Sequence, residues 1–430
     1  MKTLITKGTI IPMDSSIPKI LIGDIAVDGR KIISVGSVPS GFEADRVIDA
    51  SHSIVLPGFV NAHCHLSMVL LRNYADDLDL FTWLHEKIWP IEAKFTREHV
   101  YMSSLLGSAE LIRSGVTSFA DMYFFPEETC RAVEKAGIRA SIGADFMGDA
   151  EKIGRKLPGF QKLFDNWHGR DHGRIRIDTA PHSAYTLTPE ALQMAIGFAK
   201  KNKTAIHIHI AESKSESKEI YKRYGLTPVE YLERAGLFDN KVYAAHCVHL
   251  SDNDLEILKR SGIVPVHNPT SNLKLGNGIA PVPQMFAKGI SPALGTDGAS
   301  SNNNLNMFEE IHLAAIIHKG NTGDPTAVSA YEALQMATIN GARALGIENI
   351  CGSLTPGKDA DIVFLDTGGT HLQPMHDPIA ALAYSAQASD VHFTMCSGRI
   401  LMEDREIKTF NEGEVINQVC NDTKDLMGSK

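Results

Sequence analysis

Short apolar runs alternate with amphipathic stretches along the middle of the chain. VTSFADM and RIRIDTA precede the helix-like stretches PEETCRAVEKAG and TPEALQMAIGFAKKN, and TAIHIHIA, KVYAAHCV, GIVPVHN and SPALGTDG are each followed by a helical pattern. This alternation predicts a parallel α/β architecture. Polar residues cluster just after about eight strand candidates, where a closed barrel keeps its active site. We therefore expect a (β/α)8 TIM barrel. No Gly-rich phosphate loop follows the first strand, so a dinucleotide-binding sheet has little support.

The two ends of the chain share a different pattern. TLITKGTII, IGDIAVDG and KIISVGSV near the N-terminus, and DIVFLD and VHFTMCSGRI near the C-terminus, are typical of strands separated by turns. The polar residues that follow are expected to form a frayed tail. The sequence therefore predicts two domains: a composite β-sandwich from residues 1–56 and 350–430, and a catalytic barrel from residues 57–349.

Composition excludes several classes of protein. A net charge of −9 without a basic stripe argues against nucleic acid as a partner. No segment approaches the ~20 consecutive apolar residues of a membrane helix, and the N-terminus lacks the features of a secretion signal. Six scattered cysteines without CxxC spacing fit free thiols in a reducing compartment. We expect a cytoplasmic protein.

Two histidine pairs are the first candidates for chemistry. His63 and His65 in LPGFVNAHCHLSM are two residues apart, so on a strand both side chains face one way and can reach one ion. In TAIHIHIAES, His207 and His209 also share a face, and Glu212 just past the strand suits proton transfer. We choose His209 as the metal ligand because it lies nearer the strand's C-terminal end. A hydrogen-bonded core histidine is the simpler interpretation of His207.

Two further strand ends carry polar residues. His246 follows KVYAA, and Asp297 follows SPALGT, where a buried carboxylate is costly unless it is paired or binds a cation. Three imidazoles and a carboxylate suit zinc or another first-row divalent metal, with a water completing the site. Each motif alone is weak, but together they occur in order at four different strand ends and favour a metal site.

Together with HNPTSNLKLGNGIAP and LGTDGASSNNNLNMFEE, these motifs resemble those of the amidohydrolase superfamily, in its cytosine-deaminase and chlorohydrolase-like branch. The resemblance spans nearly the whole chain and is closest to the 5′-methylthioadenosine/S-adenosylhomocysteine deaminases. It implies one divalent metal ion, Zn²⁺ before Fe²⁺ or Mn²⁺. The implied ligands are His63, His65, His209 and Asp297. RIRIDTAPHSAY offers no lysine for a bridging carbamate, which agrees with a single metal.

The resemblance also implies a reaction, hydrolytic deamination at C6 of an adenine nucleoside, which gives an inosine-type product and ammonia. By the same resemblance, Asp297 would accept a proton from the attacking water, Glu212 would carry the proton to the ring nitrogen, and His246 would orient the hydroxide. Glu212 and Asp297 therefore also count as substrate-binding residues.

Substrate contacts follow from two other segments that resemble those of the family. Trp83 and Glu92 lie in DLFTWLHEKIWPIEAKF, which resembles the segment that covers the nucleoside, and Glu92 would accept hydrogen bonds from the ribose hydroxyls. Alone, Glu92 is a charge on an amphipathic helix. His182 in TAPHSAYTLTPE matches a substrate-contacting histidine.

The sequence departs from the family at an arginine. Members that bind homocysteine offer two arginines to its carboxylate. The first would fall near Ala144 or Asp145, where no arginine stands, and the second matches Arg155, which is also compatible with a surface position. We therefore expect 5′-methylthioadenosine, 5′-deoxyadenosine or adenosine to be handled at least as well as S-adenosylhomocysteine.

Other functions stay open at this point. The same machinery could act on guanine, a pterin, cytosine or an s-triazine, because all undergo hydroxide attack on an electron-poor ring carbon. A non-catalytic relative that binds a nucleoside is a more distant alternative. The expected partner is a small-molecule nucleoside, with no nucleic acid and no membrane, and the chain is compatible with a homo-oligomer.

Overall fold

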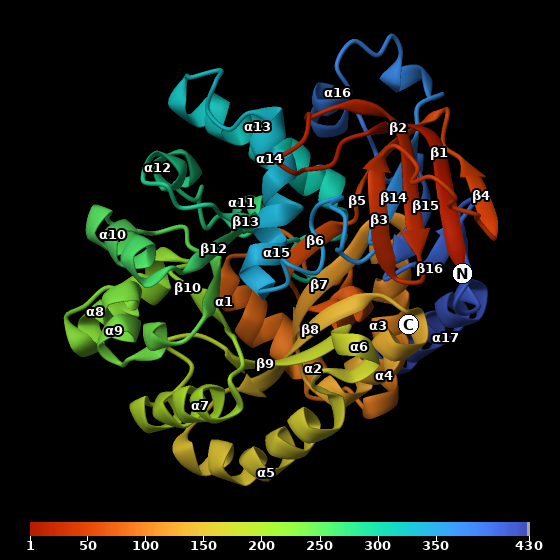
Figure 1. Ribbon diagram of the computed structural model, residues 1–430. Coiled ribbons are helices and arrows are strands. Elements are labelled where there is room, and N and C mark those ends of the chain that lie inside the picture. Colours follow the sequence, from red (N-terminus) through yellow and green to blue (C-terminus); the bar gives the residue numbers. More distant parts are fainter. Residues whose placement is uncertain (428–430) are drawn as a thin grey trace.

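A computed structural model describes residues 1–427, and a parallel β-barrel forms its centre (Figure 1). Within these residues, eight parallel strands pair in chain order. They are β6 (Phe59–Cys64), β7 (Val116–Met122), β8 (Arg139–Phe146), β9 (Ile175–Pro181), β10 (Ile206–Ile210), β11 (Val242–His246), β12 (Val264–His267) and β13 (Ala293–Leu294). The predicted TIM barrel is confirmed.

The connections between barrel strands are mainly helical. From β6 to β9 they contain the 3₁₀ helix η1 (Leu66–Leu71), α1 (Leu80–Thr82), the π-helix η2 (Trp83–Ile88), α2 (Trp89–Glu92), α3 (Arg97–Arg113), α4 (Pro126–Ala136), α5 (Ala150–Trp167) and α6 (Arg170–Gly173). From β9 to β13 they contain α7 (Pro189–Asn202), α8 (Lys214–Tyr224), α9 (Pro228–Arg234), the 3₁₀ helix η3 (Leu237–Asp239), α10 (Asp252–Ser261), α11 (Pro269–Lys274) and α12 (Val282–Ala287). After the last barrel strand come α13 (Met307–Thr322), α14 (Ala330–Met336) and α15 (Ile339–Leu345).

Helix α7 illustrates how local sequence sets these boundaries. The Thr188 side chain accepts a hydrogen bond from the backbone N–H of Ala191, and Pro189 occupies the first turn, where its missing N–H costs nothing. Leu192 and Ala199 are buried on one face of the helix. Helical spacing of apolar residues thus gives the barrel its outer packing layer.

The barrel closes between its first and last strands through side-chain hydrogen bonds. Asn61 on β6 is fully buried; its Oδ1 accepts from the backbone N–H of Thr296 at 3.0 Å, and its Nδ2 donates to Thr296 Oγ1 at 2.7 Å. The backbone N–H of Asp297 donates to the His63 carbonyl at 3.0 Å. Closure therefore brings the last predicted ligand beside the first, although more than half the chain separates them.

Both ends of the chain contribute to a second sheet beside the barrel (Figure 1). Its nine strands within the described residues are β1 (Lys2–Ile10), β2 (Leu21–Asp28), β3 (Lys31–Gly36), β4 (Arg46–Asp49), β5 (Ser53–Pro57), β14 (Ile362–Asp366), β15 (Val391–Cys396), β16 (Arg399–Glu403) and β17 (Glu406–Ile407). β5 joins the two ends by pairing antiparallel with β14 and parallel with β1.

The predicted β structure built from both chain ends is confirmed as one continuous sheet whose strands run in mixed directions. The backbone N–H of Ile32 on β3 donates to the carbonyl of Lys358 at 2.9 Å, which joins one sheet edge to the segment ahead of β14. The boundaries 1–56, 57–349 and 350–430 stay a prediction, and residues 428–430 lie outside the described residues.

A buried ion-pair network joins the barrel to the composite sheet. Arg139 at the start of β8 is 1% exposed. Its Nη2 lies 3.0 Å from Asp359 and its Nε lies 3.2 Å from Asp361, just ahead of β14. Removing one partner would leave an uncompensated buried charge, a loss of about 3–5 kcal/mol in such networks.

The C-terminal helices correct one expectation from the sequence. The segment after β17 is the helix α17 (Glu412–Met427), not a frayed tail, and it packs against α3. Val415, Val419 and Leu426 are buried at helical spacing within an otherwise polar sequence, which conceals the pattern. Shorter helices η4 (Thr370–Leu372), α16 (Pro378–Tyr384) and η5 (Ala388–Asp390) precede it.

No helix within residues 1–427 is long and apolar enough to cross a membrane.

Replacing Asn61 with Ala is expected to lower the free energy of unfolding by about 2–3 kcal/mol, because the Thr296 N–H and hydroxyl lose buried partners. Urea unfolding of the variant and the parent measures this loss. Asn253→Ala is the matched control, since Asn253 bonds Glu230 on the exposed surface. A loss below about 0.5 kcal/mol for Asn61→Ala, as for ordinary surface changes, would contradict this account of closure.

Candidate functional site: a histidine-carboxylate centre at the barrel mouth

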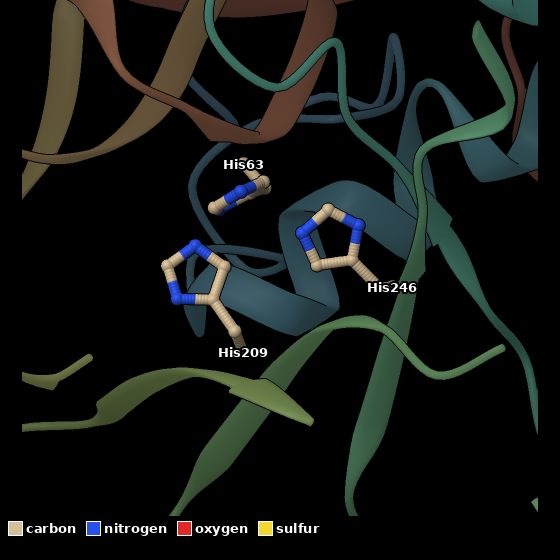
Figure 2. Close-up of side chains that lie close together, drawn as sticks. All are labelled: His63, His209 and His246. Atoms are coloured by element: carbon tan, nitrogen blue, oxygen red, sulfur yellow. The ribbon is translucent and has the colours of Figure 1, made fainter. Parts of the chain in front are cut away.

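Polar side chains from four strand ends meet at the C-terminal mouth of the barrel. Figure 2 shows the rings of His63, His209 and His246 facing one another, and their nearest ring nitrogens lie within 4.8 Å of one another. A second group within the same limit contains His63, His65 and the Asp297 carboxylate. The two groups overlap at His63, so the structure brings together all four predicted metal ligands and His246.

Backbone carbonyls fix the tautomers of two of these imidazoles. His65 Nδ1 lies 2.5 Å from the Met122 oxygen, and His209 Nδ1 lies 2.6 Å from the His182 oxygen. Because a carbonyl oxygen only accepts, both Nδ1 atoms carry a proton, so each ring in its neutral form presents a lone pair at Nε2.

Those two lone pairs converge on one point. His65 Nε2 and His209 Nε2 are 3.3 Å apart, and Asp297 Oδ1 lies 3.3 Å from His65 Nε2. His63 Nε2 is buried without a hydrogen-bond partner and lies 3.4 Å from the same carboxylate oxygen. Lone pairs and a carboxylate this close repel one another unless a cation lies between them, so the donor set fits a metal ion.

Asp297 is held as an anion by its surroundings. Its Oδ2 accepts from Ser271 Oγ at 2.6 Å and Ser301 Oγ at 2.9 Å, and its Oδ1 accepts from the Gly298 N–H at 2.8 Å. Burial alone raises the pKa of this carboxyl, but the neighbouring imidazoles, led by His63, outweigh it and hold the pKa well below its usual value. Asp297 therefore provides negative charge for a cation.

Glu212 and His246 form a second pair beside this centre. Glu212 is 8% exposed, accepts from Asn277 Nδ2 at 3.0 Å, and faces His246 Nε2 at 3.8 Å. Burial raises the pKa of Glu212. Burial disfavours the imidazolium of His246, but the Glu212 and Asp297 carboxylates outweigh it and raise that pKa. Both shifts favour the protonated form, as suits groups that transfer protons.

One short segment orients three of the predicted catalytic side chains. Ser271 bonds Asp297, Asn272 Oδ1 lies 2.9 Å from His246 Nδ1, and Asn277 bonds Glu212. The residues fall in α11 and the loop after it, within the run SNLKLGN. In the sequence analysis this run served only as part of the resemblance to the family, and no role was assigned to its residues. Its several small polar side chains, which follow no strand or helix periodicity, were the feature that could have marked it as part of the site.

Backbone conformation at the strand ends is unusual for L-residues. Ala211 after β10, His246 and Cys247 at the end of β11, and Asp297 beyond β13 all have positive φ, between 49° and 72°. Such conformations cost free energy and persist where surrounding contacts enforce them, most often at functional sites. Here they turn the chain so that Glu212, His246 and Asp297 face the same space.

The cavity above this centre contains the other predicted substrate residues except Arg155. Trp83, Glu92 and His182 line it, and so do Tyr123 and Tyr185, which sequence reasoning missed. Its apolar walls include Met68, Leu80, Leu84, Trp89, Phe124 and Leu275. An apolar cavity with convergent polar groups is typical of a small-molecule site.

Glu92 lies at the end of three short helices, α1, η2 and α2, rather than on one amphipathic helix. It is 7% exposed, and the Tyr123 hydroxyl donates to its carboxylate. Burial, which outweighs that hydrogen bond, raises the pKa of Glu92 to about 7. The simpler interpretation of Glu92 as a surface charge is therefore wrong.

His182 lies at the end of β9, beside the cavity. Its Nδ1 lies 3.3 Å from both Ser183 Oγ and Thr186 Oγ1. Burial, the largest effect, and the neighbouring imidazoles lower its pKa to about 3. His182 is therefore a neutral hydrogen-bonding group at physiological pH.

Arg155 lies away from this cavity, on the exposed face of α5. Its guanidinium bonds Glu151 at 2.8 Å, and the two side chains are 70% and 80% exposed. It lines an adjoining cavity that shares Glu92 and Asp145 with the first. Asp145, where the resemblance called for an arginine, pairs with Lys156 at 3.2 Å. Asp145 therefore lines both cavities, while its partner Lys156 and Arg155 line only the adjoining one.

Comparisons with known proteins agree with this geometry. The model of the Amidohydrolase family matches residues 54–401, and the chain belongs to this family. The chain is 47% identical over 429 residues to a 5-methylthioadenosine/S-adenosylhomocysteine deaminase of Thermoanaerobacter pseudethanolicus, covering 99% of this chain and 100% of the relative. The predicted resemblance to that subfamily is confirmed.

Two further similarities extend this comparison. A 5′-deoxyadenosine deaminase of Methanothermobacter thermautotrophicus is 43% identical over 92% of each chain. The crystal structure of an adenosine deaminase from Xanthomonas campestris with bound zinc superposes with a TM-score of 0.94 at 31% identity, covering 99% of this chain and 98% of that one.

Replacing Glu92 with Gln is expected to stabilise the fold at pH 8 by up to about 3 kcal/mol. The pKa of Glu92 is raised from 4.5 to about 7, so its contribution to stability falls as pH rises through that window. Urea unfolding at pH 5 and pH 8 measures the effect, with exposed Glu86→Gln as control. An equal effect of Glu92→Gln at both pH values would contradict the assignment.

Proposed function

We propose that this protein is a metal-dependent hydrolytic deaminase that converts 5′-modified adenosines to the corresponding inosines and ammonia. The observation that carries the proposal is the convergence of the His65 and His209 lone pairs on the Asp297 carboxylate, at the floor of a cavity with an ionisable Glu92 in its wall. The deaminase names of the relatives at 43–47% identity support the same reaction.

The proposed ligands are His63, His65, His209 and Asp297, and the proposed metal is Zn²⁺, with Fe²⁺ or Mn²⁺ as alternatives. His246 also lies within reach of the centre. Its Nε2 lies 3.8 Å from the Glu212 carboxylate, and the Glu212 and Asp297 carboxylates outweigh burial and raise its pKa, so it is the weakest candidate for a ligand. The zinc in the similar adenosine deaminase structure supports the choice of metal.

A bound divalent cation supplies Lewis acidity, which lowers the pKa of a water from 15.7 towards ~7. The protein's own residues move the protons. Asp297 accepts a proton from the attacking water while the water oxygen bonds to C6 of the purine. Protonated Glu212 delivers its proton to ring nitrogen N1, and His246 stabilises the developing negative charge. The proton on Asp297 then passes to the amino group, the C6–N6 bond breaks and ammonia leaves, while the proton of the new C6 hydroxyl returns to Glu212 as the C6 carbonyl forms.

Substrate orientation falls to the cavity walls. Trp83 supplies an apolar face whose Nε1–H is buried without a partner, His182 offers a neutral ring nitrogen, and Glu92 accepts from the ribose hydroxyls when ionised. An ionisable carboxylate in an apolar wall is costly unless a ligand uses it. This favours a ribosylated purine over guanine, cytosine, a pterin or a triazine, which carry no vicinal hydroxyls.

We extend the proposal to the organisation of the protein. Residues 57–349 form the catalytic barrel domain and residues 1–56 and 350–430 the composite β domain. We also propose a cytoplasmic location, on the basis of the scattered cysteines without CxxC spacing, which fit free thiols in a reducing compartment.

An ammonia-release assay tests the proposed reaction. We expect turnover of adenosine, 5′-deoxyadenosine and 5′-methylthioadenosine, with guanine, cytosine, pterins and triazines inert. Glu212→Gln is expected to lower kcat by at least about 10²-fold, because it removes the proton carrier. Glu219→Gln, an exposed glutamate that bonds Arg223 on α8, is the matched control and should keep parental activity. Release from guanine or a pterin alone would reject the proposal.

A second experiment tests which substituent at the 5′ position of the nucleoside the enzyme prefers. Asp145 lines both the cavity above the centre and the adjoining cavity, and its negative charge repels a carboxylate, so kcat/KM for S-adenosylhomocysteine should not exceed that for 5′-methylthioadenosine. Asp145→Asn should raise the ratio of the first to the second by about threefold to tenfold, since it leaves Lys156 free for the carboxylate. Asp165→Asn on the exposed face of α5 is the control. A parent that prefers S-adenosylhomocysteine would overturn this selectivity.

A further inference from the structure

His207 is a buried histidine that the proposed mechanism leaves without a role. It lies on β10, two residues before His209, and its side chain is fully buried. Its Nε2 lies 2.7 Å from Nδ1 of His63. The hydrogen bond therefore links His207 to the side of His63 that points away from the metal centre.

The tautomers of the two rings are coupled. If His63 binds an ion through Nε2, that nitrogen carries a lone pair and the proton of the neutral ring is on Nδ1. His63 Nδ1–H then donates, and His207 Nε2 must accept, so the proton of His207 is on its own Nδ1. A residue at position 207 that lacks an acceptor would leave a buried N–H of His63 without a partner.

The rest of the barrel core fixes the ring of His207. Tyr243 is its register partner on β11, and the two rings stack at 4.4 Å between centroids with an interplanar angle of 27°. The Tyr243 hydroxyl donates to Asp178 Oδ2 at 2.9 Å, and all three side chains are buried. His207 Nδ1 has no hydrogen-bond partner. The core thus tolerates an unpartnered N–H so that Nε2 can face His63.

We propose that His207 is a positioning residue for the metal ion, which holds His63 in the ligating tautomer and ring orientation. The other two ligand imidazoles receive this support from backbone carbonyls, those of Met122 and His182. His63 instead bonds to the side chain of His207, so a substitution at position 207 can remove this hydrogen bond. The inference rests on the metal site of the proposed function but not on the identity of the substrate.

The test measures the metal, not turnover. Zn²⁺ dissociation constants are determined with a competing chelator for the parent, His207→Leu and His207→Gln. Gln places an amide oxygen near the position of Nε2 and can accept, whereas Leu cannot. We expect His207→Leu to bind Zn²⁺ about 10–100-fold more weakly and His207→Gln to stay within about threefold of the parent. The visible spectrum of the Co²⁺-loaded protein should change in the Leu variant and be restored in the Gln variant.

His318→Leu is the matched control. His318 on α13 is 1% exposed, and its Nε2 has no hydrogen-bond partner, so its loss removes a buried imidazole away from the centre. Its Zn²⁺ affinity should equal that of the parent. If His207→Leu does not fold, as judged by circular dichroism, His207→Met replaces it, because its thioether is only a weak acceptor.

Two results would overturn the inference: parental Zn²⁺ affinity in the folded Leu or Met variant, or an equal loss in that variant and in His207→Gln. The second result would assign His207 to packing alone. Because no substrate enters the assay, failure of the deaminase proposal would appear separately, as a protein that shows the expected metal affinities and releases no ammonia from nucleosides.

Discussion

Closure of the barrel is the constraint on which the rest of the site depends. The β13 strand has only two residues, so the usual ladder of strand hydrogen bonds is short there. Asn61 bonds Thr296 through both ends of its amide, and the Asp297 N–H donates to the His63 carbonyl. These bonds set the distance between the first and last motifs of the chain. The Asp297 carboxylate reaches the histidines of β6 because the barrel closes in this register.

Within the closed barrel, polar groups of the site are buried although their burial lowers the stability of the fold. Glu92 and Glu216 are buried carboxylates whose pKa values burial raises to about 7, and Glu216 accepts from the N–H groups of Ala211 and Glu212. These interactions keep the turn after β10 in its left-handed conformation, so that Glu212 projects over the centre. Apolar residues at these positions would stabilise the fold more, whereas the buried carboxylates orient the groups of the site. Such a loss of stability is expected where stability and function compete.

Much of this arrangement could be predicted from the sequence, for identifiable physical reasons. The spacing of apolar residues predicted the barrel and the composite sheet, because burial of one face imposes a characteristic spacing on strands and on helices. The positions of polar residues at strand ends predicted the site residues, since the C-terminal ends of parallel strands meet at one mouth of a barrel. These residues are His63, His65, His209, His246 and Asp297. The helix α17 escaped prediction because its buried residues are spaced within a polar sequence. The hydrogen bonds of Ser271, Asn272 and Asn277 could not be predicted because they depend on contacts between distant strand ends. The sequence could not decide between the two interpretations of Arg155, because packing sets the orientation of its helix.

The central claim is that one ion binds where the lone pairs of His65 and His209 converge on Asp297, and anomalous X-ray diffraction at the metal's absorption edge tests it most directly. The account predicts a single peak per chain, bonded to Nε2 of His63, His65 and His209 and to the Asp297 carboxylate, with His246 outside bonding distance. A peak bonded to His246 with Asp297 out of reach, or two peaks in the barrel mouth, would contradict it.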